Sequence, residues 1–405
     1  MEQLDLIRSL AEEKDSKILL LVLDGLGGLA TEPGGKTELE TARTPNLDAL
    51  ARESSCGLME LVAPGITPGS GPGHLALFGY DPITYIIQRG ALEAAGIDFP
   101  QQAGDVATRA NFCTIDADGN ITDRRAGRIP TEESAALCAL LQREVTLEGV
   151  ELFIQPVQEH RAVVVFRGKG LGDQVHDTDP QQTGVPPLPP KASSDDPASQ
   201  RTAQLASKFL ARVREVLRGK HPKANMMMLR GFSLRPHLPQ FGEVYKLKAA
   251  AEATYPMYRG LARLVGMEIL TPRATFAECV EEVASNWAKF DFFFLHYKYT
   301  DSRGEDGNFA KKVEAVETVD AELPKLLALK PDVVAVTGDH STPSKLASHS
   351  WHPVPVLVRS PYVRADGLTK FGESGCVRGS LGHFAAVHLM PLLLANALRL
   401  AKYGA

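Results

Sequence analysis

Three strongly hydrophobic segments constrain the fold of this chain most, because an acidic residue ends or follows each one. They are residues 17–24, which end in Asp24, residues 290–296, which lead to Asp301, and residues 332–337, which lead to Asp339 and His340. Continuous hydrophobicity over a strand-sized segment predicts strands that are covered on both faces, as in an α/β sheet. A fourth such segment, residues 353–358, follows His349. Because ligands of open α/β sheets bind beyond the carboxyl ends of the strands, we expect these polar groups to converge there.

The order of the elements predicts a sheet interrupted by an inserted domain. Helical patterns at residues 44–51 and 311–320 alternate with the strands, which supports an α/β core. The middle of the chain differs, with short strand-like segments at 108–114 and 161–167 and a proline-rich segment at 180–190. We therefore expect a doubly wound core from residues 1–97 and 246–405, and a smaller inserted α+β domain from residues 98–245, with hinges at the two junctions.

The composition of the chain limits the kinds of partner that we expect it to bind. The 405 residues include 44 Lys and Arg against 49 Asp and Glu, so the net charge of −5 provides no global attraction for nucleic acid or an anionic membrane. An anion site must then be a local cluster of basic residues. The five cysteines are scattered without a CxxC pair, which favours free buried thiols in a reduced cytoplasm. The amino terminus lacks the basic region and apolar run of a signal peptide, and no apolar run is long enough to span a membrane.

Carboxylates and imidazoles at the strand ends form the donor set of a divalent metal site. Two such ions can hold the attacking and leaving oxygens of a phosphoryl group. The candidate ligands are Asp24, Asp301, Glu305, Asp339, His340 and His349. Alone, an aspartate at a strand end is more often a helix cap or a turn former. The adjacent pair Asp339–His340, followed by His349, is what favours the metal interpretation.

Ser70 is the candidate nucleophile. It lies in a glycine-rich segment, residues 68–82, with glycine on both sides and Pro72 at a position typical of a first helical turn. A serine at a helix amino terminus faces free amides that favour phosphate, and a nearby metal can help to ionise its hydroxyl. The alternative is an ordinary capping serine in a glycine-rich loop.

Several motifs resemble, in order, those of the alkaline phosphatase superfamily, and more narrowly those of the archaeal-type 2,3-bisphosphoglycerate-independent phosphoglycerate mutases. They occupy residues 23–27, 70–82, 109–111, 123–128, 177–180, 230–231, 301–308, 337–343 and 348–355, and so cover nearly the whole chain. The resemblance implies an alkaline-phosphatase-like core with an inserted domain. It also implies a metal-dependent isomerase of small phosphorylated metabolites that acts through a phosphoserine.

The resemblance assigns the metal ligands to two sites. One metal would be held by Asp24, Ser70, Asp339 and His340, and the other by Asp301, His349 and the residue at position 305. The family usually has histidine at that position, whereas this chain has Glu305. Glutamate still ligates Mn²⁺ or Mg²⁺ through oxygen, so we expect these ions, with Zn²⁺ or Co²⁺ as alternatives, and an altered metal preference.

The inserted segment should bind the anionic substrate. Asp123, Arg124, Arg125 and Arg128 form a compact motif whose guanidiniums suit bidentate binding of phosphate or carboxylate. Further candidates for substrate binding or catalysis are Arg109, Arg161, Arg230, Lys248 and Arg259. Because lysine and arginine are mostly exposed, each could equally be a solvated surface charge. His74, about one helical turn after Ser70, is expected either to orient the loop or to reach the substrate.

The leading hypothesis is interconversion of 3-phosphoglycerate and 2-phosphoglycerate in glycolysis and gluconeogenesis, with Ser70 as nucleophile and Lys248 as a group that neutralises charge. One alternative is a metal-dependent phosphomonoesterase, or a mutase for another small phosphorylated metabolite. Another is a non-catalytic protein that binds a phosphorylated metabolite, for which Glu305 is the motivating feature. The sequence leaves the oligomeric state open.

Overall fold

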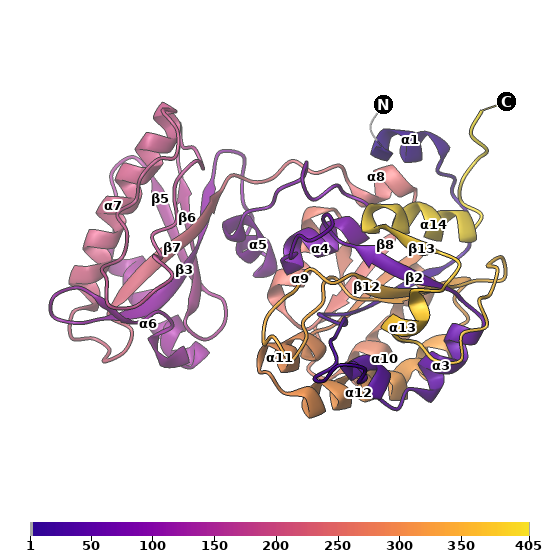
Figure 1. Cartoon of the computed structure of the whole chain (residues 1–405). Helices are drawn as coiled ribbons and strands as arrows, with labels where there is room; N and C mark the ends of the chain where they lie inside the picture. Colours follow the sequence, from indigo (N-terminus) through magenta and orange to yellow (C-terminus); the bar gives the residue numbers. More distant parts are fainter. Residues whose placement is uncertain (1–2, 405) are drawn as a thin grey trace. The chain divides into compact units, whose positions relative to one another are not determined.

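The computed structural model describes residues 3–404, which divide into two compact units. Residues 3–86 and 238–404 form the first unit, and residues 87–237 form the second. Figure 1 shows the course of the chain through both. No helix within residues 3–404 is long and apolar enough to cross a membrane.

The first unit is built on an eight-stranded sheet with the strand order β13-β2-β12-β11-β1-β10-β8-β9. Strand β1 pairs in parallel with both β10 and β11, and β8 extends the parallel part beyond β10. Strand β12 is antiparallel to β11 and β2. The strands are β1 (Ile18–Leu23), β2 (Ser55–Glu60), β8 (Ala249–Ala253), β9 (Glu268–Ile269), β10 (Phe292–Tyr297), β11 (Val333–Thr337), β12 (Val354–Arg359) and β13 (Gly382–Ala385).

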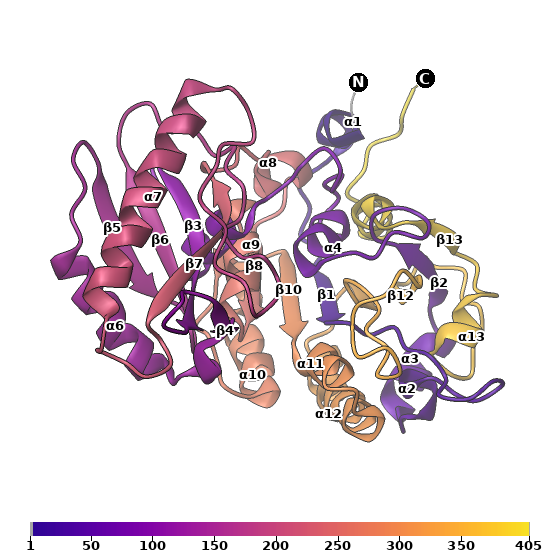
Figure 2. The ribbon, with the colours of Figure 1, turned by 60° about the vertical axis from the view of Figure 1, so that its left-hand side comes forward.

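Helices cover both faces of this sheet, so its central strands are buried on both sides. Helices α10 and α12 pack on one face, and α4, α9 and α14 lie on the other (Figure 1, Figure 2). The helices of this unit are α1 (Gln3–Leu10), α2 (Glu38–Thr41), α3 (Pro45–Arg52), α4 (Ser70–Leu77), α8 (Phe241–Tyr245), α9 (Pro256–Leu264), α10 (Phe276–Asn286), α11 (Tyr299–Glu305), α12 (Phe309–Ala328), α13 (Glu373–Cys376) and α14 (Leu389–Asn396), with 3₁₀ turns η2 (Trp287–Lys289) and η3 (Ala386–His388).

The four hydrophobic segments of the sequence form the centre of this sheet. Every residue of β1, β10 and β11 is buried, as expected for continuously apolar strands between two helical layers. The predicted α/β fold class, a doubly wound core carrying a smaller α+β insert, is therefore confirmed. All five cysteines are free and buried, also as predicted.

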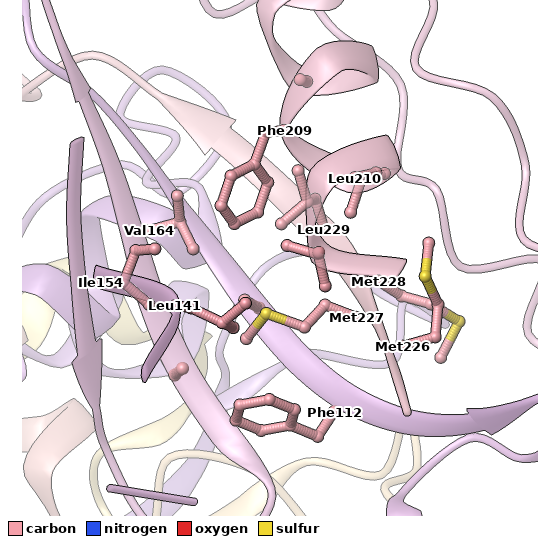
Figure 3. Packing of buried hydrophobic residues seen from close by; sticks show 14 of the residues in the cluster. Phe112, Leu141, Ile154, Val164, Phe209, Leu210, Met226, Met227, Met228 and Leu229 are labelled. Carbon is pink, nitrogen blue, oxygen red and sulfur yellow. The ribbon is translucent and has the colours of Figure 1, made fainter. Parts of the chain in front are cut away.

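The second unit has a five-stranded antiparallel sheet in which β3 pairs with β4, β6 and β7, and β5 pairs with β6. Its core lies between one face of this sheet and helices α6 and α7, with Phe112, Val164, Phe209 and Met227 packed together (Figure 3). The elements are α5 (Arg89–Gly96), β3 (Val106–Ile115), β4 (Ile121–Asp123), η1 (Ala126–Arg128), α6 (Thr131–Glu144), β5 (Glu151–Pro156), β6 (Arg161–Arg167), α7 (Pro197–Leu217) and β7 (Met226–Ser233).

The unit boundaries fall earlier than the junctions expected at residues 97/98 and 245/246. Helix α5 belongs to the second unit because it packs against β3 and β7. Gly90 lies so close to β3 that a Cβ there would be 2.1 Å from the carbonyl oxygen of Ala107. Helix α8 belongs to the first unit, where it packs against α1.

Candidate functional site

The parallel strands bring the predicted acidic residues to one edge of the sheet. Because β1 lies between β10 and β11, residues that follow these three strands are neighbours. Asp24 directly follows β1, Asp301 lies in α11 after β10, and Asp339 and His340 lie just beyond β11. The predicted convergence at the carboxyl ends of the strands is thus present in the structure.

Asp24, Asp339 and His340 form the first group that could hold a metal ion. The Nε2 atom of His340 lies 3.2 Å from Asp24 Oδ1 and 3.3 Å from Asp339 Oδ2, and all three side chains are fully buried. Those two carboxylate oxygens are buried and accept no hydrogen bond. Because a buried carboxylate oxygen without a donor is costly, the donor set fits a divalent cation.

Asp301, His340 and His349 form the second group. His349 Nε2 lies 3.5 Å from Asp301 Oδ1, and its ring stacks on that of His340 with centroids 3.6 Å apart. His349 Nδ1 donates to the carbonyl oxygen of Pro68 at 3.0 Å, which leaves Nε2 to face the group. Glu305 Oε1 lies 3.9 Å from His349 Nε2, and the Glu305 side chain is 56% exposed. Glu305 is therefore at the rim of this group and within reach of it.

Ser70 is the first residue of α4, at the expected helix amino terminus. Its Oγ lies 3.2 Å from His340 Nε2. The glycine at position 73 permits this arrangement, because a Cβ there would lie 2.1 Å from the carbonyl oxygen of Asp339. The glycine-rich segment therefore lets α4 pack directly on the loop that carries Asp339 and His340.

His74 has the contacts of a residue that orients this site, which is one of the two roles we expected for it. It is completely buried one turn after Ser70. Its Nδ1 donates to the Ser70 carbonyl oxygen at 2.8 Å and lies 3.1 Å from Asp339 Oδ2. His74 is therefore a positioning residue for Ser70 and Asp339.

Asp24 is held by two aromatic side chains from the same face of the sheet. His296 Nε2 donates to Asp24 Oδ2 at 3.1 Å, and the hydroxyl of Tyr258 donates to the same oxygen. The two rings stack with centroids 3.8 Å apart. These donors use Oδ2 and leave Oδ1 facing His340.

Lys298 is the basic residue of this site that sequence reasoning missed. Its Nζ donates to Asp301 Oδ2 at 2.5 Å, to Asp24 Oδ2 at 3.1 Å and to the Tyr258 hydroxyl at 3.1 Å. Burial opposes the charge, but the carboxylates of Asp24 and Asp301 hold the pKa of Lys298 well above its usual value. The available signal was its place directly after β10, three residues before Asp301.

Lys248 does not reach the site. It precedes β8, which runs parallel to β10, so it lies at the opposite edge of the sheet from Asp24. Its backbone N–H donates to Asp291 at 3.1 Å, and its ammonium lies over the Phe290 ring. Arg259 is at the correct edge, but its Nη1 donates to the carbonyl oxygens of Ala253 and Thr254 at 3.1 and 2.6 Å.

The charges of the first group influence one another strongly. Burial opposes ionisation of Asp24, but Lys298 and then His296 and His340 keep its pKa well below the usual value. Burial likewise opposes protonation of His340, yet Asp339 and Asp24 raise its pKa to about 9. Without a metal, the His340 proton therefore compensates part of the negative charge.

The predicted basic motif of the second unit separates into two parts. Arg124 makes a bidentate pair with Asp179 at 2.9 and 2.7 Å, and Arg230 lies 3.2 Å from Asp177 and 3.3 Å from Asp179. Their charges are therefore already partnered by carboxylates. Arg125 and Arg128 are exposed.

The carboxylate of Asp123 shapes the turn that carries these arginines. It accepts the backbone N–H groups of Arg125 and Gly127 at 2.7 and 2.6 Å. The turn has positive φ at three successive residues, 48° at Ala126, 63° at Gly127 and 50° at Arg128. Asp123, which we predicted to bind substrate, is thus engaged with the backbone.

His160 is a buried imidazole of the second unit whose pKa depends on several arginines. It is 2% exposed. Burial, together with the positive charge of nearby arginines, lowers the pKa of His160 to about 3. These arginines are Arg161, Arg109, Arg125 and Arg128. Among these arginines, Arg109 is already paired, with its Nε 3.2 Å from Glu93 Oε1, whereas Arg125 and Arg128 are exposed.

A family model matches part of this chain, and related proteins match it over its full length. A family model described as 2,3-bisphosphoglycerate-independent phosphoglycerate mutase matches residues 51–223. A Thermus thermophilus protein named as a probable mutase of this kind is 55% identical over 410 residues, with 100% of both chains covered. An Aquifex aeolicus protein of the same name is 50% identical and covers 99% of this chain and 100% of its own.

Two solved structures are similar to this chain over nearly its whole length. A Pyrococcus horikoshii protein has a TM-score of 0.83 at 29% identity, over 96% of this chain and 99% of its own. The cofactor-independent phosphoglycerate mutase of Thermoplasma acidophilum has a TM-score of 0.70 at 29% identity, over 94% and 100%.

The α/β sheet carries candidate metal-binding side chains beyond the carboxyl ends of its parallel strands, and its full-length relatives define the chain as an isomerase. It belongs to the 2,3-bisphosphoglycerate-independent phosphoglycerate mutase family.

Proposed function

We propose that the protein interconverts 3-phosphoglycerate and 2-phosphoglycerate without a diffusible bisphosphate, a step of glycolysis and gluconeogenesis. The observation that carries this proposal is the position of Ser70 at the start of α4, with its Oγ 3.2 Å from His340 Nε2 among Asp24 and Asp339. Full-length identity with members of the mutase family supports the choice of substrate.

The residues present fit two divalent cations. Asp24, Ser70, Asp339 and His340 would hold one, and Asp301, His349 and Glu305 the other, with His340 close to both groups. When bound, Mn²⁺ or Mg²⁺, or alternatively Zn²⁺ or Co²⁺, would supply Lewis acidity toward the phosphoryl oxygens and the Ser70 hydroxyl. The oxygen donor of Glu305 favours the harder ions, Mn²⁺ and Mg²⁺.

Ser70 is the nucleophile of this reaction. Its Oγ loses a proton and forms a bond to phosphorus, while the bond between phosphorus and the substrate oxygen breaks and that oxygen takes up a proton. The free amides at the amino terminus of α4 stabilise the phosphoryl group during transfer. In the second half of the reaction, the other hydroxyl of the retained glycerate accepts the phosphoryl group from Ser70.

Lys298, and not Lys248, is the lysine that neutralises charge beside Ser70. Its ammonium bridges Asp24 and Asp301, one ligand from each proposed metal site. This contact stabilises a dense cluster of carboxylates at the point where a doubly charged phosphoryl group must approach.

Retention of glycerate separates a mutase from a phosphatase. If glycerate leaves while Ser70 carries the phosphoryl group, water takes it and inorganic phosphate is released. We assign substrate binding to the second unit, to the exposed Arg125 and Arg128 together with Arg109 and Arg161, whose charges all act on His160. Such guanidiniums bind a carboxylate through charge-assisted, bidentate hydrogen bonds.

The test is a product assay. Purified protein loaded with Mn²⁺ is given 3-phosphoglycerate without any bisphosphoglycerate, and both 2-phosphoglycerate and inorganic phosphate are measured. We expect 2-phosphoglycerate as the main product. Release of phosphate without the isomer would identify a phosphomonoesterase and overturn the proposal. Absence of any turnover by a metal-loaded protein would support a binding protein.

A further inference from the structure

Lys312 is a buried lysine beside the candidate metal site that the mechanism above does not use. It lies in the first turns of α12 and is 0% exposed. Its neighbour Lys311 is exposed and pairs with Glu314 at 2.7 Å. Burial of an ammonium is costly unless all its donors are satisfied, so the burial of Lys312 needs an explanation.

Three backbone carbonyl groups accept hydrogen bonds from the Lys312 ammonium. Its Nζ donates to Gly25 and Gly27 at 2.9 Å each and to Thr342 at 2.8 Å. These bonds use all three N–H donors of the ammonium. The carbonyls come from two loops, residues 25–27 after β1 and residues 341–342 after β11, so the ammonium joins both.

Both loops carry candidate metal ligands. Gly25 directly follows Asp24, and Thr342 follows His340 by two residues. The Thr342 hydroxyl donates to Asp301 Oδ1 at 2.6 Å, and it lies 2.9 Å from His340 Nδ1. Through Gly25 and Thr342, Lys312 therefore acts on Asp24, Asp301 and His340, which belong to both candidate groups.

The two loops are in such close contact that their spacing cannot change without disturbing both. Gly25 has φ +63°, and a Cβ there would lie 2.5 Å from the Thr342 hydroxyl oxygen. A Cβ on Gly27 would lie 1.8 Å from Ser341 Oγ. The Thr342 amide also donates to the carbonyls of Gly25 and Gly27, at 3.3 and 3.0 Å. The loops are thus as close as glycine permits, with Lys312 bonded to both.

From these contacts we propose that Lys312 is a positioning residue, which sets the spacing between the Asp24 loop and the His340 loop and thereby the affinity for divalent metal. This rests on the metal role in the proposed function. It adds to that function a residue that touches neither metal nor substrate. Groups that orient metal ligands typically change metal affinity by about 10–100-fold when removed.

The experiment compares three variants in metal-free protein titrated with Mn²⁺ by calorimetry. Lys312→Met keeps the apolar stem but removes all three donors, whereas Lys312→Gln retains two N–H donors. Lys311→Met is the matched control, since it removes a lysine from the adjacent, exposed position of the same helix. Circular dichroism and thermal unfolding establish, for each variant, the temperature below which it is folded.

We expect at least about tenfold weaker Mn²⁺ binding in Lys312→Met, a smaller loss in Lys312→Gln and wild-type affinity in Lys311→Met. A folded Lys312→Met protein with wild-type affinity would show that the lysine serves stability alone and would overturn the proposal. So would failure of both Lys312 variants to fold. If the wild-type protein binds no Mn²⁺, this proposal fails whatever the mutase assay reports. A protein that binds Mn²⁺ but forms no 2-phosphoglycerate would contradict only the proposed function.

Discussion

The hydroxyl oxygen of Ser70 lies 3.2 Å from Nε2 of His340. His340 Nε2 also lies within 3.3 Å of carboxylate oxygens of Asp24 and Asp339, so the hydroxyl adjoins the candidate metal donors. The relationship joins the candidate nucleophile on a helix to candidate metal ligands at strand ends.

Ser70→Ala should reduce kcat at least about 10³-fold, because removing a catalytic nucleophile leaves only binding and electrostatic contributions. Formation of 2-phosphoglycerate in a coupled assay measures the loss. Ser285→Ala, which removes an exposed serine hydroxyl on α10, should retain full activity. A Ser70→Ala enzyme with more than a tenth of the wild-type kcat would rule out Ser70 as nucleophile.

Lys298→Met should lower kcat about 10²-fold or more, because it leaves the buried carboxylates of Asp24 and Asp301 without their shared cation. Lys248→Met is the matched control, since Lys248 lies at the other edge of the same sheet. Its kcat should stay within about twofold of wild type, as expected for a surface substitution. If Lys248→Met lowered kcat strongly and Lys298→Met did not, Lys248 would be the lysine that neutralises charge and the assignment to Lys298 would be wrong.

Glu305→His should change which metal ion the enzyme prefers, and the enzyme should remain active. Imidazole in place of carboxylate removes a hard oxygen donor beside His349, so activity with Zn²⁺ or Co²⁺ should rise relative to Mn²⁺ or Mg²⁺. Activity is compared across the four ions, with Glu314→His, at an exposed position of α12, as control. An inactive parent that histidine rescues would refute Glu305 as a functional ligand.

Arg125→Ala and Arg128→Ala should each raise KM for phosphoglycerate about tenfold or more, since a charge-assisted hydrogen bond contributes about 1.5–3 kcal/mol. Steady-state kinetics measures the change. Arg212→Ala, which removes an exposed arginine paired with Glu215 on α7, should leave KM unchanged. Equal KM values for all three variants would place the substrate elsewhere.

The buried carboxyl group of Glu252 should make the free energy of unfolding depend on pH. It is 1% exposed, and its Oε2 has no hydrogen-bond partner. Burial raises its pKa from 4.5 to about 7. A raised pKa of an acid stabilises the fold below pH 4.5, and this contribution disappears as the pH rises through 7.

Glu252→Gln should therefore be about 2–3 kcal/mol more stable than wild type at pH 8 and nearly equal at pH 4.5. Urea unfolding of metal-free protein at several pH values measures the difference. Glu281→Gln, at an exposed position of α10, controls for general charge effects. A pH-independent difference between Glu252→Gln and wild type would contradict the assignment.

The central sheet and the convergence of most candidate metal donors could be predicted from sequence, because continuously apolar strands and acidic strand ends are local signals. Lys248 was favoured because the strand that follows it was not recognised. Strand β8, Ala249–Ala253, is rich in alanine and lacks the large apolar side chains that mark a central strand. Knowing that Lys248 precedes a parallel strand would have placed it at the opposite edge from Asp24.

Partners distant in sequence account for the other differences. Arg124 and Arg125 are adjacent in one motif, and only Asp179, 55 residues from Arg124, distinguishes the partnered guanidinium from the exposed one. Lys311 and Lys312 are equally adjacent, and the cage of carbonyls around Lys312 comes from residues about 30 and 287 positions away. Spacing within a helix does not encode such contacts.

Passage of the phosphoryl group through Ser70 is the central claim, and one measurement tests it most directly. The Mn²⁺-loaded enzyme is quenched in acid during turnover of 3-phosphoglycerate, digested and analysed by mass spectrometry. We predict phosphate on the peptide that contains Ser70, and none when substrate is omitted. Full mutase turnover with no phosphate on Ser70 at any quench time would contradict the account.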